Sequence, residues 1–131
     1  MRVMIDTNIL ISAVVFPNDR INAVIIKAAT EHKLLISAQI IEELYHVVAR
    51  KFSGKAAAVD DFLTKLPFEY VYATRQPQPG LFVIRDEKDY PILYTAIMEG
   101  ADVFITGDKD FQGINMDKPE IVTPSEFLER Y

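Results

Sequence analysis

The sequence contains 131 residues, of which 50% are hydrophobic and 25% are charged, and its formal net charge at pH 7 is −5. This composition excludes a disordered or low-complexity chain, and we expect a single domain over residues 1–131. Because the sequence contains no cysteine and two histidines, disulfide bonds and thiolate zinc sites are excluded, and any bound metal would be held by oxygen.

Strands and helices alternate through the first half of the sequence. Residues 2–6 are a short hydrophobic run that ends in Asp-Thr-Asn, which predicts a buried strand that stops at a polar turn. Apolar residues at helical spacing predict a helix over about 20–31. A short strand follows at 34–36, and Ser37 is a suitable N-cap for a helix that continues to about Phe52.

The second half continues this alternation and contains the most loop-like stretch, Gln-Pro-Gln-Pro-Gly at 76–80. The other predicted elements are a helix at 55–66, a strand-like alternation at 69–74, a helix that starts near Pro91 and ends at Gly100, strands at 102–106 and 121–122, and a helix at 125–130. This order predicts an α/β fold, a three-layer α/β/α sandwich with a mostly parallel central sheet.

The apolar stretches are too short for a membrane segment. A membrane span needs about 18 consecutive apolar residues, and Asp6 precedes any apolar region that could act as a secretion signal. We therefore expect a cytoplasmic protein with no membrane association. The mild acidity argues against a surface coated in positive charge, but it permits a metal-dependent nuclease, because such a site itself concentrates carboxylates.

Two predicted strands end in aspartate, namely Asp6 after Val-Met-Ile and Asp108 after Val-Phe-Ile-Thr-Gly. In open parallel sheets, ligands bind beyond the carboxyl ends of the strands. If both strands are central, the two acids share one edge of the sheet. The alternative for each acid is an Asx-turn or a helix cap, and we favour that alternative when either residue is taken alone.

Two predicted helices add acids that can reach the same edge. Glu43 lies at the border of the apolar arc of its helix, whereas Glu42 faces water. Asp89 continues the core-facing stripe at the start of the helix near Pro91. The alternatives are a boundary residue or an ion pair with Lys51 for Glu43, and an N-cap for Asp89.

The four acids together indicate a metal site more strongly than any one of them. Crowded carboxylates repel one another and raise one another's pKa values, so they persist as anions mainly around a divalent cation. Mg²⁺ or Mn²⁺ fits, because these ions prefer oxygen ligands. Such a metal activates water and stabilises the leaving oxygen of a phosphodiester. The predicted reaction is hydrolytic cleavage of a nucleic acid strand.

Four sequence patterns resemble those of PIN-domain ribonucleases, most closely the VapC-type toxins of prokaryotic toxin–antitoxin pairs. They are Met-Ile-Asp-Thr-Asn-Ile-Leu at 4–10, Ile-Glu-Glu-Leu at 41–44, Arg-Asp with Asp89 ahead of a helix, and Thr-Gly-Asp-Lys-Asp-Phe at 106–111. The resemblance implies that Asp6, Glu43, Asp89 and Asp108 bind Mg²⁺ or Mn²⁺ and that the substrate is single-stranded RNA. It also implies a homodimer and a small antitoxin that inhibits the enzyme.

Further residues are candidates for the same site. Asp86 could replace Asp89, and Asp110 could share or replace the role of Asp108. Thr7, Asn8 and Thr106 are candidates for orienting the carboxylates or a metal-bound water, with turn hydrogen bonding as the alternative role.

Basic and aromatic residues could contact the RNA. Lys88 and Lys109 are the preferred phosphate contacts among the basic residues, which also include Arg85. Several tyrosines, including Tyr70 and Tyr72, could stack on bases, although packing in the fold is the commoner role of such residues.

Two other functions are consistent with parts of the sequence. A phosphatase of the haloacid-dehalogenase type also begins with a strand that ends in Asp, but it needs an acid two residues later, where this chain has Asn8. A catalytically silent protein of the same fold, serving as a binding module for RNA or for another protein, is the non-enzymatic alternative. Binding of divalent metal ions would distinguish it from the nuclease.

Overall fold

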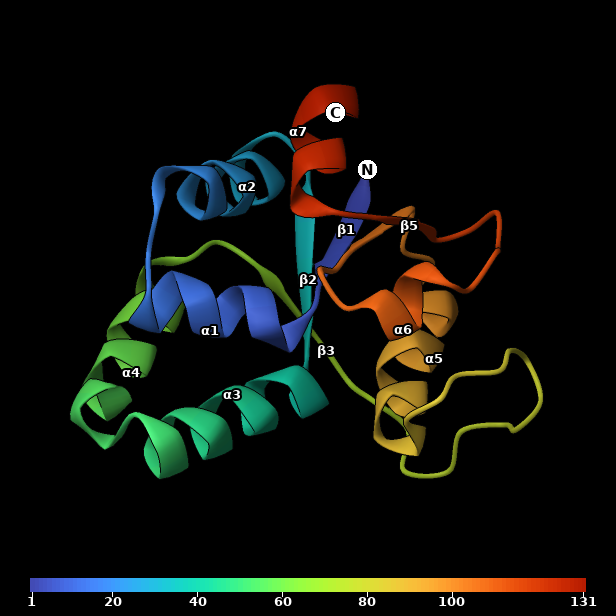
Figure 1. Cartoon of the computed structure of the whole chain (residues 1–131), viewed down its shortest axis with the longest axis horizontal. Helices are drawn as coiled ribbons and strands as arrows, with labels where there is room; N and C mark the ends of the chain where they lie inside the picture. The colour runs from blue at the N-terminus through green and yellow to red at the C-terminus, as the bar shows by residue number, and fades with distance from the viewer.

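The computed structural model describes all residues 1–131 and contains one five-stranded parallel sheet (Figure 1). The strand order is β3-β2-β1-β4-β5, and every neighbouring pair is parallel. The strands are β1 (Arg2–Ile5), β2 (Lys33–Ser37), β3 (Glu69–Val71), β4 (Val103–Ile105) and β5 (Glu120–Val122). The prediction of an α/β sandwich with a mostly parallel sheet is confirmed, and the sheet is parallel throughout.

The chain reverses its direction across the sheet at β1. It passes from β1 to β2 and β3 on one side and then returns to β4 on the other side. Val3 pairs with both Leu34 of β2 and Val103 of β4, so β1 is central. Ligands of open parallel sheets bind at such a reversal, outside the carboxyl ends of the strands. Asp6 and Thr106, the first residues beyond β1 and β4, lie at this point.

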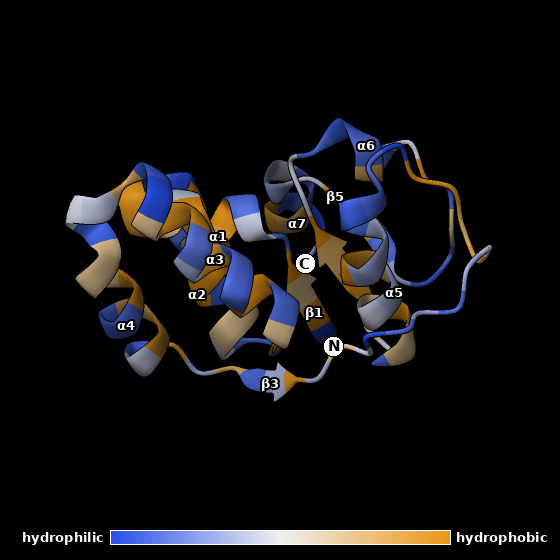
Figure 2. Ribbon diagram, turned by 90° about the horizontal axis from the view of Figure 1, so that it is seen from below, coloured by the Kyte–Doolittle hydropathy of each residue, from blue (hydrophilic) through white to orange (hydrophobic).

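Helices cover both faces of the sheet (Figure 2). α1, α2, α3 and α4 lie on one side and α5 lies on the other (Figures 1 and 2). None of the helices has the length and apolar character needed to cross a bilayer. The helical elements are α1 (Thr7–Val15), α2 (Asp19–Thr30), α3 (Ala38–Lys51), α4 (Ala56–Lys65), α5 (Tyr90–Met98), α6 (Lys109–Gln112) and α7 (Pro124–Arg130), with 3₁₀ turns η1 (Ser53–Lys55) and η2 (Glu87–Asp89).

The core consists of the strands and the inward faces of the helices. Met4, Leu35 and Phe104 are fully buried in adjacent strands. Strands of a parallel sheet covered on both faces are apolar throughout rather than alternating, as these are. On α3, Ile40, Leu44 and Val48 are buried at four-residue intervals, which confirms the helix that the spacing predicts.

Two helices differ from the sequence-based expectation. Residues 7–15 form α1 instead of a polar turn, and residues 109–112 form the short helix α6. α1 is apolar around most of its circumference, so its sequence has no amphipathic period to indicate a helix. The polar Asp-Thr-Asn that suggested a turn is instead the N-terminal end of this helix, where Asp6 is the N-cap.

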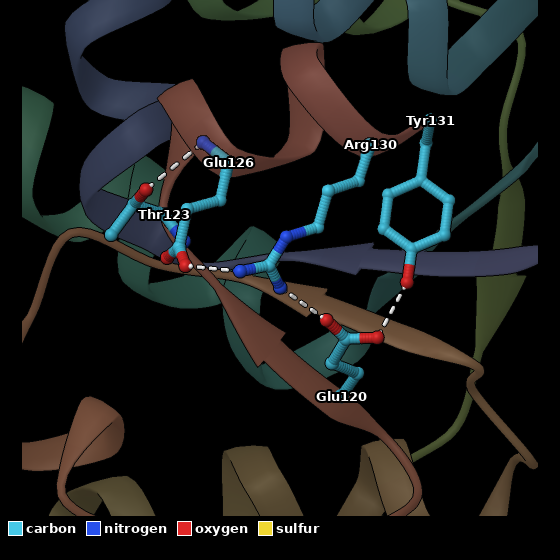
Figure 3. Close-up of polar contacts among 5 residues, drawn as sticks. All are labelled: Glu120, Thr123, Glu126, Arg130 and Tyr131. Carbon is cyan, nitrogen blue, oxygen red and sulfur yellow. Dashed lines mark hydrogen bonds and ion pairs between the residues drawn. The ribbon is translucent and has the colours of Figure 1, made fainter.

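The C-terminal helix is held by a capping box (Figure 3). The Glu126 backbone N–H donates to Thr123 Oγ1 at 3.1 Å, and the Thr123 N–H donates to the Glu126 carboxylate at 2.9 Å. α7 therefore begins at Pro124, one residue before the predicted start. These reciprocal bonds satisfy backbone donors that a helix start otherwise leaves unpaired.

Candidate active site

Asp6 is fixed rigidly at the exit of β1. Its side chain is 4% exposed. Its Oδ1 accepts a hydrogen bond from the Thr7 N–H at 2.8 Å, and its Oδ2 accepts one from the Thr106 hydroxyl at 2.9 Å. The Asp6 N–H donates to the Ile105 carbonyl at 2.9 Å. The carboxylate is therefore held at the junction of β1 and β4.

Thr106 connects Asp6 to Asp108. The Thr106 hydroxyl donates to Asp6, and it accepts a hydrogen bond from the Asp108 N–H at 3.0 Å. Asp108 is the N-cap of α6, and its Oδ1 accepts from the Asp110 N–H at 2.9 Å. The cap leaves the second carboxylate oxygen of Asp108 without a hydrogen bond in the chain, so the capping role and a role in ligand binding are compatible here.

The two candidate acids before α5 differ in what their side chains contact. Asp86 is exposed, and its Oδ1 accepts from the Lys88 N–H at 3.0 Å, which caps η2. Asp89 occupies the N-cap position of α5, but its side chain forms no capping hydrogen bond. Asp89 is partly buried, and its carboxylate belongs to an oxygen group with Asp108 and Asp110 whose atoms all lie within 4.8 Å of one another.

Asp110 carries an ion pair that the sequence analysis missed. Its Oδ2 accepts from Arg85 Nε at 3.2 Å and from Nη2 at 3.1 Å. We expected Arg85 only as one of several basic residues near the site. The two residues are 25 positions apart, on a loop and on a short helix, and no local pattern links them. Arg85 thus compensates the charge of Asp110 but of no other acid in the group.

Glu43 is not part of the oxygen group of Asp89, Asp108 and Asp110, but its charge interacts with the neighbouring acids. The negative charge of Glu43 raises the pKa of Asp6, and the charge of Asp89 raises the pKa of Glu43 after the larger effect of burial. Such effects require proximity. Among the expected basic residues, Lys88 is close enough to oppose this rise in the pKa of Glu43. Asp6 directly follows β1, Glu43 lies on α3, Asp89 ends η2, and Asp108 lies between β4 and α6.

Burial and mutual repulsion make two of these acids weak. Burial raises the pKa of Asp6 to about 6, with further increases from Glu43 and Asp108, although the hydrogen bonds from Thr106 and Thr7 favour the anion. Burial also raises the pKa of Asp89 to about 6, followed by the charges of Asp86, Asp6, Asp108 and Asp110. Metal-free protein at neutral pH therefore holds several carboxylates whose charge the chain itself does not compensate.

The donor set fits a hard divalent cation. All the donors are oxygen atoms, as Mg²⁺ and Mn²⁺ prefer. The Thr7 hydroxyl is buried and interacts with the Glu43 carboxyl, whose pKa it lowers. Asn8 is exposed and its side chain forms no hydrogen bond in the chain, so of the three candidate neighbours Thr7 and Thr106 contact the carboxylates and Asn8 does not.

Comparison with known proteins agrees with this architecture. The PIN domain family model matches residues 2–110. The uncharacterized protein MJ1680 of Methanocaldococcus jannaschii is 31% identical over an alignment that covers all of this chain and 92% of the relative.

Two solved structures share the fold. VapBC2 from Rickettsia felis, bound to a DNA fragment from its promoter, superposes with a TM-score of 0.70 at 22% identity over 93% of this chain and 97% of that chain. VapC20 from Mycobacterium tuberculosis, a toxin that cleaves the sarcin–ricin loop, superposes with a TM-score of 0.58 at 13% identity over 86% and 96%. Because the family model matches most of its length, the chain belongs to the PIN domain family.

Proposed function

We propose that this protein is a metal-dependent endoribonuclease that hydrolyses phosphodiester bonds of single-stranded RNA. The observation that carries the proposal is the convergence of carboxylates from separate elements at the point where the sheet reverses its strand order. In this proposal Asp6, Glu43, Asp89 and Asp108 bind Mg²⁺ or Mn²⁺. When bound, the metal would activate water and stabilise negative charge on the phosphate.

The contacts within the chain support specific roles for these acids. Thr106 holds Asp6 and Asp108 in a fixed relation through its hydroxyl, which is the kind of support that keeps metal ligands oriented. The position of the Asp89 carboxylate within one oxygen group with Asp108 and Asp110, a group that does not include Asp86, supports Asp89 over Asp86. The ion pair of Asp110 with Arg85 supports a secondary role for Asp110, because Arg85 competes with a metal for that carboxylate.

The similarity to VapC proteins supports a biological role as the toxin of a toxin–antitoxin pair. VapC20 is a toxin that cleaves the sarcin–ricin loop, and VapBC2 binds a DNA fragment from its promoter. By analogy we propose a small antitoxin as the partner of this chain and a homodimer as its assembly. The fold itself does not specify the RNA that is cut, since many sites can be carried by one fold.

A cleavage assay tests the nuclease proposal directly. End-labelled single-stranded RNA is incubated with the protein and Mg²⁺ or Mn²⁺, and we expect internal cuts that EDTA prevents. Asp6→Asn should abolish cleavage, because it removes one anionic ligand while keeping the shape of the side chain. Asp19→Asn is the matched control, since Asp19 is an exposed acid in the first turn of α2, outside the acidic group.

The same assay can contradict the proposal in two ways. Equal cleavage by the wild type and by Asp6→Asn would show that a contaminant or another site is responsible. If calorimetry detects no Mn²⁺ binding and RNA still binds, the chain is a binding module and not a nuclease.

A further inference from the structure

Two tyrosines stand exposed at the end of β3. Tyr70 is 46% exposed and Tyr72 is 79% exposed. Their ring centroids are 5.1 Å apart and the ring planes are nearly perpendicular at 89°, so each ring restricts the orientation of the other. Large aromatic side chains are normally buried in a fold of this size. Exposed aromatic rings offer faces on which nucleic-acid bases can stack.

The ring of Tyr72 stands between two hollows in the surface. One hollow has a volume of about 410 Å³ and is lined by Gln39, Glu42, Tyr70, Tyr72 and Arg75, among others. The second has a volume of about 300 Å³ and lies between Tyr72 and the side of α5. Both are of the size of small-ligand sites, which start near 300 Å³. Tyr72 therefore has open space beside it for a planar group to stack.

Arg75 gives this surface a free positive charge. It is exposed, and none of the ion pairs of the chain includes it. Guanidinium groups bind phosphate with two parallel hydrogen bonds. An unpaired arginine beside exposed aromatic rings is the combination with which proteins bind single-stranded nucleic acid, through phosphate contacts and base stacking.

The surface lies next to the acidic site. Gln39 of the larger hollow and Glu43 are four residues apart on α3, which is about 6 Å along the helix axis. The Gln39 amide oxygen lies 3.5 Å from the Thr95 hydroxyl, so α3 and α5 meet between the two hollows. A strand bound at the acids can continue toward β3.

We propose that Tyr70, Tyr72 and Arg75 form a nucleotide subsite that holds single-stranded RNA beside the acidic site, with a base stacked on Tyr72 and a phosphate on Arg75. This inference rests on the proposed ribonuclease function and adds the residues that position its substrate. The subsite binds without strong preference for one base, because every base offers a face for stacking. Its contribution is to substrate affinity and not to the chemical step.

RNA binding in EDTA tests the subsite without requiring cleavage. We measure the affinity of a fluorescein-labelled single-stranded RNA of mixed sequence by anisotropy. Tyr72→Ala should weaken binding by about 5- to 150-fold, the range for loss of one stacked base, while Tyr72→Phe stays close to the wild type. Arg75→Gln should reduce the slope of log affinity against log salt by about 0.7, the value for one phosphate contact of a single strand.

Two control substitutions test whether a loss of RNA affinity is specific to Tyr72 and Arg75. Tyr45→Ala removes another exposed tyrosine, which bonds to Asp60 away from this surface, and Arg20→Gln removes an exposed arginine that bonds to Ser125. Neither should change RNA affinity or salt dependence. In Mg²⁺, Tyr72→Ala should raise KM with kcat nearly unchanged, which a merely structural role would not do.

The possible outcomes separate the subsite from the nuclease function. If the wild type cleaves RNA and Tyr72→Ala binds and cleaves like the control, the subsite is wrong and the nuclease proposal stands. If Tyr72 governs RNA binding but no divalent metal produces cleavage, the subsite stands and the nuclease proposal fails. If Tyr72→Ala leaves RNA affinity unchanged and converts a dimer to a monomer in ultracentrifugation, the surface joins two copies of this chain and the subsite is again wrong.

Discussion

The carboxylates beyond β1 and β4 and those around β5 and α7 differ in what compensates their charge. At the first location, burial and neighbouring acids raise the pKa values of Asp6, Glu43 and Asp89. At the second, the acids have cationic or backbone partners. Glu120 and Glu126 both contact the guanidinium of Arg130, and Glu120 also accepts a hydrogen bond from Tyr131 (Figure 3).

Acids that have cationic or backbone partners have lowered pKa values, in contrast to the raised pKa values of Asp6, Glu43 and Asp89. Asp102, just before β4, accepts a hydrogen bond from the Arg2 N–H at 2.8 Å and pairs with Lys118 at 3.2 Å. These contacts, the backbone bond first, lower its pKa. The Thr123 N–H likewise lowers the pKa of Glu126. The acids with cationic or backbone partners therefore stabilise the fold. The acids near Asp6 destabilise it until a proton or a metal ion neutralises their charge.

The largest expected effect separates the two acids before α5. Asp89→Asn should reduce the rate of metal-dependent RNA cleavage by at least about 100-fold, because it removes a free carboxylate from the proposed metal ligands. Asp86→Asn removes only a cap of η2 and should cost a few-fold at most. Single-turnover cleavage rates of the two variants measure this. The reverse order would assign the metal to Asp86.

Addition of Mn²⁺ should stabilise the folded protein, and this stabilisation should depend on the acids near Asp6 and not on Asp102. At an ion concentration of 100 times Kd the folded protein should gain about 2.7 kcal/mol in its free energy of unfolding, seen as a rise in Tm. Asp6→Asn should lose most of this gain, whereas Asp102→Asn should keep it. A gain that both variants keep equally would indicate general ionic screening and not binding at the acids.

The pH dependence of stability should also differ between the two groups. A folded-state pKa of about 6 for Asp6 exceeds its unfolded value, so the folded state binds more protons and the metal-free protein loses stability as pH rises from 4 to 6, by about 1–3 kcal/mol. Asp102, whose pKa is lowered, has the opposite sign and loses its contribution only below pH 4. Urea unfolding at several pH values measures the slope.

Saturating Mn²⁺ should remove this loss, because the metal replaces the protons on the acids. The affinity for Mn²⁺ should weaken as pH falls through about 6, where Asp6 and Asp89 become protonated. A metal-free protein whose stability rises between pH 4 and 6 would contradict the uncompensated state of these acids.

Loss of a compensated acid should affect the fold but not the activity. Glu126→Gln weakens the capping box of α7 and removes an ion pair with Arg130, and we expect a cost of about 1 kcal/mol in the free energy of unfolding. Chemical denaturation measures the cost and the RNA cleavage rate provides the control. A large loss of cleavage would contradict the separation of the two groups.

The smallest expected effect concerns Arg85. Its guanidinium is 85% exposed and pairs with Asp110, so Arg85→Gln should change the free energy of unfolding by less than about 0.5 kcal/mol. The substitution frees Asp110, and we expect Mn²⁺ to bind a few-fold more tightly in calorimetry. Unchanged affinity would place Asp110 outside the metal ligands.

Local patterns were sufficient to predict most elements and to select Asp6 and Asp108 as candidate site residues. The continuous apolar runs predict the parallel strands, and the spacing of Ile40, Leu44 and Val48 predicts α3. Asp6 and Asp108 follow from the rule that sites lie beyond the ends of parallel strands. α1 could not be predicted in this way, because a helix that is apolar on most sides has no period.

The sequence by itself determined that the chain would fold as strands alternating with helices and that acids would follow two of its strands, because these features depend on neighbouring residues. Only the tertiary structure decided that Asp89 rather than Asp86 lies in one oxygen group with Asp108 and Asp110, that Arg85 pairs with Asp110, and that Arg75 stands beside two exposed tyrosines. These relations depend on where distant segments meet when the core is packed, and no spacing along the chain encodes that geometry.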